Sequence, residues 1–216
     1  LPFASAAGHG MKDITGHWAE PDIGWVIEMG LFSGTSATTF SPNGTMTRGM
    51  FVTVLGRYAG IDPDEFEDWY LPDLYKDVDA DAYYAPYINW ATRHGITSGT
   101  GGGNFSPDAP LNREQMATFL LRFANCYGYV FEPIREDVPD RFTDEASISG
   151  YARDAVEIMR ESGVISGRQN ADGTFKFDPN ALAVRSECAA VFHRLLSAMV
   201  IDEDFFFEEP EEIAVF

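Results

Sequence analysis

Three arginines occupy the same place in three similar stretches of the sequence, and each could bind an anion. Each lies six residues after the proline of an aromatic-x-proline triplet; they are Arg48, Arg113 and Arg185. A guanidinium presents a planar fork of N–H donors that matches a carboxylate. At a helix N-terminus, free backbone N–H groups and the helix dipole add to that charge. The pattern therefore predicts an exposed, carboxylate-binding arginine at the first position of three helices.

An acidic residue and then an aromatic residue precede each arginine. The aspartates are Asp13, Asp77 and Asp144, and the aromatics that follow them are Trp18, Tyr83 and Tyr151. Each aspartate could pair with the arginine of its own stretch, which would make that arginine structural; we favour ligand contact for at least two of the three arginines. Each aromatic could pack in the core or lie open and stack on a sugar ring. The sequence alone does not choose between these two positions.

A Gly-aliphatic-x-Ser-Gly motif lies between the aromatic and the arginine of each stretch. It runs from Gly30 to Gly34, from Gly95 to Gly99 and from Gly163 to Gly167. Its first glycine is a helix stop, because glycine adopts the left-handed conformation on which helices commonly end. The serine hydroxyls and the closing glycines could also approach sugar hydroxyls, although a structural role is favoured for the glycines. The candidate ligand residues of the motif are Ser33, Gly34, Ser98, Gly99, Ser166 and Gly167.

These landmarks keep register in three tandem repeats, which we place at residues 11–60, 75–126 and 142–200. Each repeat is expected to form a helix, a loop and a second helix. The first helices are predicted near 21–29, 85–94 and 152–162, and the second helices begin at the arginines. Thr47 and Asn112 are suitable N-caps, whereas Val184 is a weaker one. The extra residues between Gly167 and Phe177 are predicted to form a surface loop.

The repeats should form one domain, because a short helical pair cannot cover its own apolar face. We expect an all-α, mainly helical fold in which three helix-loop-helix repeats pack around a pseudo-threefold axis, without an extended sheet. Residues 1–10 are predicted to be an N-terminal linker and residues 201–216 an acidic C-terminal extension. Trp25 and Trp90 are expected to be packing residues. Cys126 and Cys188 are expected to be buried thiols rather than a disulfide.

The charge and the apolar pattern of the chain argue against nucleic-acid and membrane partners. Fifteen Lys and Arg against 34 Asp and Glu give a net charge of −19. Such a chain should repel phosphate backbones, so we expect no nucleic-acid partner. It contains no apolar run near the roughly 20 residues that span a bilayer, so no membrane insertion is expected.

Enzymatic and metal-binding readings find little support. The four histidines show no metalloprotease spacing, and no nucleophile elbow is present. Asp77, Asp79 and Asp81 begin like an EF-hand loop, but Ala82 and Ile88 stand where glycine and glutamate are required. We therefore expect no enzyme activity, no cofactor and no dedicated metal site, although weak calcium binding at the acidic surface stays open.

The order of landmarks over residues 11–200 resembles the S-layer homology repeat. That resemblance implies a pseudo-trimer of repeats whose grooves bind secondary cell wall polysaccharide attached to peptidoglycan, often through pyruvylated N-acetylmannosamine. The family's Thr-Arg-Ala-Glu motif, which supplies the arginine, corresponds here to residues 47–50, 112–115 and 184–187. Its glutamate is present only as Glu187, while Gln115 and Met50 replace it in the other repeats, so the grooves are expected to be unequal.

The resemblance implies a non-catalytic, secreted module that anchors a surface protein to a Gram-positive-type cell wall. The alternative is a protein–protein assembly module that builds an S-layer lattice through contacts with other surface proteins, without direct glycan binding. Binding to purified wall sacculi before and after removal of the polysaccharide would separate the two possibilities.

Overall fold

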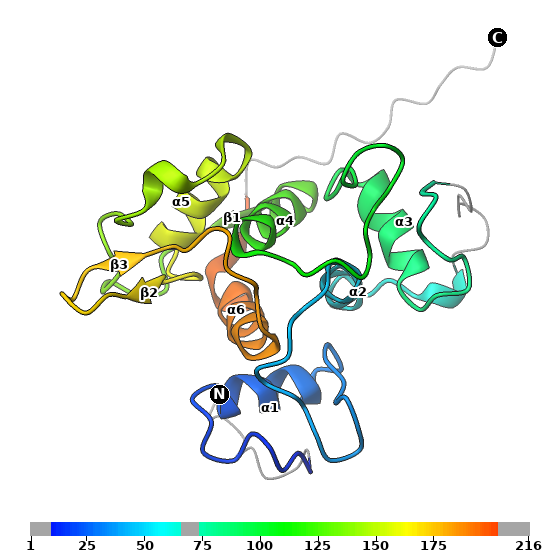
Figure 1. Cartoon of the computed structure of the whole chain (residues 1–216), viewed down its shortest axis with the longest axis horizontal. Coiled ribbons are helices and arrows are strands. Elements are labelled where there is room, and N and C mark those ends of the chain that lie inside the picture. Colours follow the sequence, from blue (N-terminus) through cyan, green and yellow to red (C-terminus); the bar gives the residue numbers. More distant parts are fainter. Residues whose placement is uncertain (1–9, 66–73, 203–216) are drawn as a thin grey trace.

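The fold is described by a computed structural model for residues 10–65 and 74–202. The greater part of the predicted N-terminal linker and of the acidic extension lies outside the described residues. Six α-helices form in the described part, and they are joined mostly by loops (Figure 1). None of these helices is long and apolar enough to cross a membrane. The prediction of a mainly helical fold is confirmed.

Each repeat contains the expected pair of helices. Repeat 1 holds α1 (Glu20–Glu28) and α2 (Arg48–Tyr58), repeat 2 holds α3 (Ala85–Arg93) and α4 (Arg113–Cys126), and repeat 3 holds α5 (Arg153–Glu161) and α6 (Arg185–Ala198). Single 3₁₀ turns lie at Pro63–Glu65, Glu145–Ser147 and Gly150–Ala152. The first helices begin and end within one residue of their predicted bounds, and the second helices begin at the arginines as predicted.

Local signals set these helix ends. The Thr47 and Asn112 side chains accept hydrogen bonds from the N–H groups of Met50 and Gln115, and Asn112 forms a complete capping box. Val184 provides no side-chain cap, as expected. After each first helix, the glycine of the Gly-x-x-Ser-Gly motif adopts a positive φ, for example 70° at Gly30. That conformation stops the helix at little cost because glycine has no Cβ.

The three repeats close into a ring by exchanging helix contacts. The first helix of each repeat packs on the second helix of the preceding repeat: α3 on α2, α5 on α4, and α1 on α6. Figure 1 shows the result as three lobes around a centre. The last of these contacts joins the two ends of the repeat array, so no repeat is terminal.

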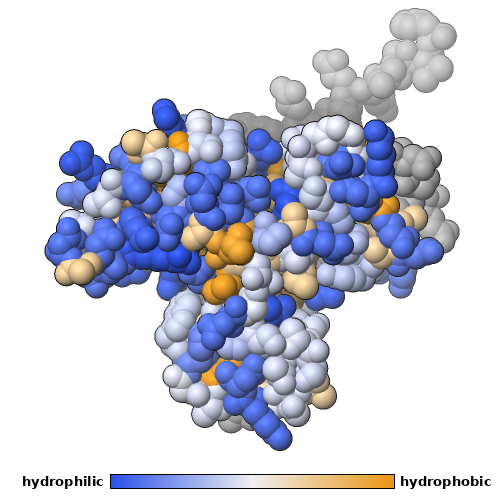
Figure 2. Space-filling view, in the orientation of Figure 1, coloured by the Kyte–Doolittle hydropathy of each residue, from blue (hydrophilic) through white to orange (hydrophobic). Residues whose placement is uncertain are grey.

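A cycle of three backbone hydrogen bonds marks the axis of the ring. The N–H of Met46 donates to Ala183 (2.9 Å), the N–H of Ala183 to Leu111 (2.8 Å), and the N–H of Leu111 to Met46 (2.8 Å). These residues precede the three second helices. In Figure 2, hydrophobic residues gather where the lobes meet, while hydrophilic residues cover most of the lobes themselves. The predicted pseudo-threefold packing is confirmed.

The core is continuous through all three repeats and contains the expected packing residues. Trp90 is fully buried, and Trp25 packs partly buried with its ring stacked on His193. The Nδ1 of His193 lies 2.6 Å from Asp22, which adds a polar contact between α1 and α6. Both cysteines are free thiols, Cys188 buried and Cys126 half-buried, so a disulfide between them is absent.

Only two small sheets form in the described residues. β1 (Tyr129–Phe131) pairs antiparallel with β4 (Met199–Ile201), so the segment after α6 lies against the linker that follows α4. β2 (Arg168–Gln169) pairs with β3 (Phe175–Lys176). The inserted residues of repeat 3, predicted as a surface loop, are therefore a short hairpin with an exposed tip.

One helix interface depends on the absence of a single methyl group. A Cβ at Gly56 on α2 would lie 2.3 Å from the Tyr87 ring on α3. We expect Gly56→Ala to lower the free energy of unfolding by about 1–3 kcal/mol, the usual cost of overpacking a core. Gly150→Ala is the control, because its Cβ would meet no atom within 4 Å. Chemical denaturation of both variants tests this; equal stabilities would contradict it.

Candidate functional site

The three arginines at the helix starts are buried, and the prediction that they are exposed is wrong. Arg48 and Arg113 are 4% exposed and Arg185 is 8% exposed. Each side chain crosses to the next repeat in the ring. Its Nε donates to the carbonyl of the Phe-x-Pro phenylalanine: Arg48 to Phe105 (3.0 Å), Arg113 to Phe177 (2.8 Å) and Arg185 to Phe40 (2.9 Å). Each arginine therefore connects two repeats.

The backbone N–H groups at these helix starts are also occupied, contrary to the sequence-based expectation. In α2, the N–H of Arg48 donates to Ala109 (3.0 Å) and that of Gly49 donates to Pro107 (2.8 Å). The corresponding groups of α4 and α6 donate to residues 181 and 179, and to residues 44 and 42. A ligand near these arginines would therefore meet the guanidinium rather than free amides of the helix end.

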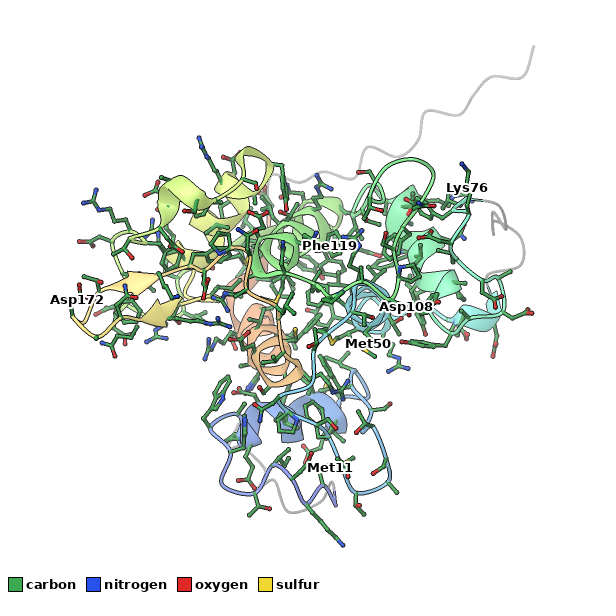
Figure 3. The ribbon with its side chains drawn as sticks, viewed as in Figure 1. Met11, Met50, Lys76, Asp108, Phe119 and Asp172 are labelled. Carbon is green, nitrogen blue, oxygen red and sulfur yellow. The ribbon has the colours of Figure 1, made fainter. Side chains whose placement is uncertain are left out.

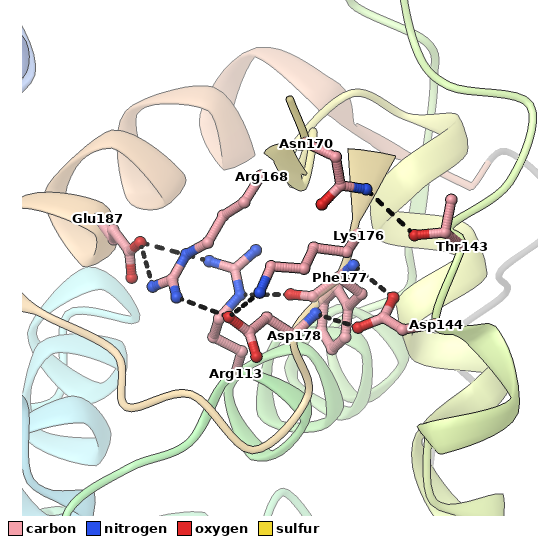
Figure 4. A network of polar contacts seen from close by, with 9 residues as sticks. All are labelled: Arg113, Thr143, Asp144, Arg168, Asn170, Lys176, Phe177, Asp178 and Glu187. Atoms are coloured by element: carbon pink, nitrogen blue, oxygen red, sulfur yellow. Dashed lines mark hydrogen bonds and ion pairs between the residues drawn. The ribbon is translucent and has the colours of Figure 1, made fainter. Parts of the chain in front are cut away.

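The three aspartates hold the Phe-x-Pro turns of their own repeats. Asp13 accepts hydrogen bonds from the N–H groups of Phe40 (2.8 Å) and Ser41 (2.7 Å). Asp77 and Asp144 bind their turns in the same way, and Figure 4 shows the Asp144 contacts. The middle residue of each turn has a positive φ, 59° at Ser41. The proposed pairing of each aspartate with its own repeat's arginine is not observed.

Burial and hydrogen bonding shift the pKa values of these groups. Burial lowers the pKa of Arg48, Arg113 and Arg185, because removal from water disfavours the charged form. Burial by itself would raise the pKa of Asp13, but the two backbone donors from Phe40 and Ser41 outweigh it and lower that pKa. Asp13 and Arg185, from neighbouring repeats, thus bind the two sides of the Phe40–Ser41 peptide. Its N–H donates to Asp13, and its carbonyl accepts from Arg185.

A groove lies between repeats 1 and 2, and we call it the first groove. It encloses about 360 Å³ between the Leu31–Thr35 loop and the face of α2. Tyr83 of repeat 2 and Arg185 of repeat 3 also line this groove. The Arg185 Nη2 donates to the Ser33 carbonyl (2.7 Å), which fixes the guanidinium against the loop. Three repeats therefore contribute to one groove.

The third groove has the same plan one step round the ring. It encloses about 300 Å³ between the loop at residues 164–168 and the face of α6. Trp18 of repeat 1 and Arg113 of repeat 2 also line this groove. Arg168, from the hairpin peculiar to repeat 3, binds Glu187 (2.8 Å) and Asp178 (3.0 Å), as Figure 4 shows.

The equivalent second groove would lie between the Gly95–Gly99 loop, α4, Tyr151 and Arg48. The Tyr151 hydroxyl donates to Glu114 (2.9 Å), and burial together with this bond raises the pKa of Tyr151 to about 12.

The three predicted aromatics are not buried in the core, and Trp18 and Tyr83 line the two grooves. Trp18, Tyr83 and Tyr151 are 58%, 56% and 54% exposed. Of the motif serines, Ser33 contributes its carbonyl to Arg185, Ser166 accepts a bond from Arg135 (2.9 Å), and Ser98 is exposed. Gly34 is structural, because a Cβ there would lie 2.5 Å from the Ser36 carbonyl. Gly99 and Gly167 are crowded in the same way.

A second set of arginines, Arg57, Arg122 and Arg194, lies late in the second helices, where a cation favourably meets the helix dipole, and two of them line the grooves. Arg57 lines the first groove and donates to Leu31 (3.2 Å), while Arg194 lines the third and donates to Val164 (3.5 Å). Each follows the first arginine of its helix by nine residues. At about 100° per residue, nine residues turn a helix by about 180° from where it started, so the two arginines face opposite grooves. The nine-residue spacing in the sequence therefore indicates that the two arginines of one helix point in opposite directions.

Comparison with known proteins identifies the family. The sequence matches the S-layer homology domain at residues 10–49, 74–117 and 141–183, one match in each repeat. The chain therefore belongs to the S-layer homology family. Domains of this family occur in S-layer and other cell-surface proteins and generally anchor them to the cell wall, which indicates a location at the cell surface.

Several relatives are longer proteins with different names. The chain is 33% identical over 184 residues to an endoglucanase of Bacillus sp. (strain KSM-635), a match that covers 83% of this chain and 18% of the relative. It is 29% identical to an amylopullulanase of Thermoanaerobacterium thermosulfurigenes, over 86% of this chain and 9% of that protein. It is 27% identical to the surface-layer 125 kDa protein of Lysinibacillus sphaericus, over 91% of this chain and 16% of the relative. The chain thus spans less than a fifth of each of them.

The S-layer homology domain is itself a non-catalytic anchoring module. The small share of the endoglucanase and the amylopullulanase that this chain matches fits a module carried beside other domains.

Proposed function

We propose that this chain fixes a larger surface protein to the cell wall by binding secondary cell wall polysaccharide in the grooves between its repeats. The observation that carries the proposal is that a buried arginine and a large aromatic, more than half exposed, line the same groove. Trp18 with Arg113 and Tyr83 with Arg185 are the two pairs. An exposed ring offers a flat apolar face to a pyranose, while a guanidinium binds carboxylates and hydroxyls.

A carboxylate-bearing sugar such as pyruvylated N-acetylmannosamine suits these groups. The chain carries a net charge of −19, so an acidic glycan would be repelled at long range. Close contacts at the arginines have to overcome that repulsion. Burial of the guanidinium groups helps, since attraction to a ligand charge is stronger where water is excluded.

The exposed aromatics offer a test that does not endanger the fold. We expect Trp18→Ala and Tyr83→Ala each to weaken binding to purified wall polysaccharide about tenfold, the effect of about 1.4 kcal/mol of lost stacking. Their melting temperatures should stay near the wild-type value because both rings are largely exposed. Met29→Ala is the matched control: Met29 is 55% exposed and is not among the residues that line the two grooves. Titration calorimetry provides the affinities.

Binding to wall sacculi decides between glycan and protein partners. Removal of the polysaccharide from the sacculi should abolish binding of the wild-type chain. If binding persists on stripped sacculi, or if both aromatic variants bind the polysaccharide as tightly as the control does, the glycan proposal is wrong and a protein or peptidoglycan partner is favoured.

A further inference from the structure

A separate pocket lies beside α5, and it differs from the grooves between the repeats. It encloses about 280 Å³, and all the residues that line it lie between positions 140 and 160. Its apolar lining is Phe142, Ile148 and Val156, each at most 4% exposed. These three side chains form an apolar floor. The pocket shares no lining residue with the first or the third groove.

A longer loop before α5 distinguishes this place from its counterparts in the other repeats. Tyr151 follows Asp144 by seven positions, 151 minus 144, whereas the corresponding interval is five in repeat 1 and six in repeat 2. The residue after the aspartate is Glu145, which is exposed, while its counterpart Ile14 in repeat 1 is fully buried. The longer loop thus carries a carboxylate at the surface where repeat 1 packs an isoleucine into the core.

The α5 side of the pocket carries charges that the other first helices lack. Four ionisable residues of this helix line the pocket: Arg153, Asp154, Glu157 and Arg160. The same places in register hold Glu20, Pro21, Gly24 and Ile27 in repeat 1, and Ala85, Pro86, Asn89 and Thr92 in repeat 2. Only one of those eight counterparts can ionise. The charged pocket is therefore a property of repeat 3 and not of the repeat as such.

The charges of the pocket do not pair with one another. Within residues 10–65 and 74–202, no carboxylate lies within 4.0 Å of the guanidinium of Arg141 or Arg153. Arg160 has a structural role, because its Nη1 donates to the Pro139 carbonyl (2.8 Å) and its Nη2 to Glu161 (2.8 Å). Arg153 is the first residue of α5, where a cation opposes the helix dipole. Its charge therefore does not serve the helix.

Both signs of charge thus surround one apolar floor. Three arginines line the pocket together with four carboxylates, those of Asp140, Glu145, Asp154 and Glu157. An anion alone would be repelled by the carboxylates, and a cation alone would be repelled by the arginines. A small ligand with an ammonium group, a carboxylate and an apolar part can form charge-assisted hydrogen bonds with both sets. A free α-amino acid with an apolar side chain has this chemistry.

We propose that the pocket beside α5 binds a free α-amino acid with an apolar side chain. The ligand carboxylate binds Arg141 and Arg153, its ammonium group binds Glu145 and Glu157, and its side chain lies on the apolar floor. This site is independent of the proposed glycan-binding grooves.

Leucine is the probe, together with two derivatives that each lack one of its charges. Leucine amide has no carboxylate, and N-acetyl-leucine has no ammonium group. We expect each derivative to bind at least about tenfold more weakly than leucine, because each loses charge-assisted hydrogen bonds. Titration of the wild-type chain, followed by the NMR shifts of its backbone amides, gives the affinities. The shifted amides should cluster at residues 140–160.

Two variants assign the charges of the ligand to the two sides of the pocket. Arg153→Gln should weaken leucine binding about tenfold without weakening leucine amide, which has no carboxylate to lose. Glu157→Gln should weaken leucine by a similar factor without weakening N-acetyl-leucine. Both side chains are exposed, so the melting temperatures should stay near the wild-type value.

Two other variants serve as matched controls, because they remove exposed charges that do not line the pocket. Arg93→Gln removes a cation on α3, and Asp172→Asn removes a carboxylate at the tip of the β2–β3 hairpin of the same repeat (Figure 3). Both should bind leucine as the wild-type chain does.

Each contrary outcome overturns a defined part of the proposal. If leucine does not bind the wild-type chain, or if the shifted amides lie outside residues 140–160, the site is wrong. Equal affinities for leucine and either derivative overturn the recognition of both charges. If Arg153→Gln weakens leucine and leucine amide equally, that arginine does not bind the carboxylate. Affinity for wall polysaccharide should be the same in all four variants, and its loss in Arg153→Gln or Glu157→Gln alone would overturn the independence of the two sites.

Discussion

A chain that ends at residue 140 is expected to lose its cooperative fold altogether, although two complete repeats remain. Without repeat 3, α1 loses α6 and α4 loses α5, so apolar faces at both ends of the remaining chain are uncovered. The Arg185 bond to Phe40 and the bond from Met46 to Ala183 are lost as well. We expect the loss of the whole free energy of unfolding, about 5–15 kcal/mol for an ordinary domain.

The reason lies in the closed ring. In a linear repeat array, stability is roughly the sum of repeat and interface contributions, so removal of a terminal repeat leaves a folded remainder. Here each repeat is an interior one, and two of the three helix interfaces disappear together. Far-ultraviolet circular dichroism during heating provides the measurement. A steep melting transition in the chain that ends at residue 140 would show that the ring does not have to be closed.

Truncation after Asp202 is the matched control. It preserves β4, which pairs with β1, and removes only part of the predicted acidic extension. We expect this shorter chain to keep its melting temperature and its glycan affinity. A large loss of either would mean that the extension belongs to the domain or to the binding site.

The Asp13→Asn variant should have the second large effect, a loss of about 2–4 kcal/mol in the free energy of unfolding. The Asp13 carboxylate accepts two backbone hydrogen bonds that hold Ser41 at a φ of 59°. Hydrogen bonds to a charged group contribute about 1.5–3 kcal/mol each. Because Asp13 is exposed to solvent, we expect its two bonds together to contribute less than two such bonds would in a buried site. Asparagine can accept only one of the two, because its amide NH₂ is a donor.

Acid should abolish this difference between wild type and variant. The pKa of Asp13 is lower in the folded chain than its ordinary value of 3.8, so the carboxylate stabilises the fold above that pH. As the pH falls below about 4 toward the folded pKa, wild type should lose the advantage while the uncharged asparagine loses nothing at that site.

Denaturation of both proteins between pH 7 and pH 3 measures this convergence. Asp79→Asn is the control, because Asp79 is exposed and accepts a bond from the N–H of Asp81, only two residues away. Its effect should stay within about 0.5 kcal/mol. A constant difference between wild type and Asp13→Asn at all pH values would show that the charge of Asp13 has no part in holding the turn.

The sequence determined by itself the features that depend on near neighbours. Helix bounds followed from apolar spacing, from caps such as Asn112, and from stops such as Gly30. The threefold register of Gly-x-x-Ser-Gly, Phe-x-Pro and arginine was visible without any structure, and it indicated the right family. The nine-residue interval between Arg48 and Arg57 also fixed their opposite directions on one helix.

Only the tertiary structure decided which repeat each side chain serves. Asp13 and Arg185 meet at the same phenylalanine although 172 positions separate them, 185 minus 13, and no local pattern encodes that distance. The ring forms because each first helix covers its apolar face on the preceding repeat rather than on its own. That exchange buries the arginines, uses the helix N–H groups on carbonyls of the next repeat, and leaves Trp18 and Tyr83 exposed beside the grooves. Helix propensity is local, whereas burial depends on which surfaces meet, and that is why the sequence located the helix starts but misjudged the exposure of the arginines there.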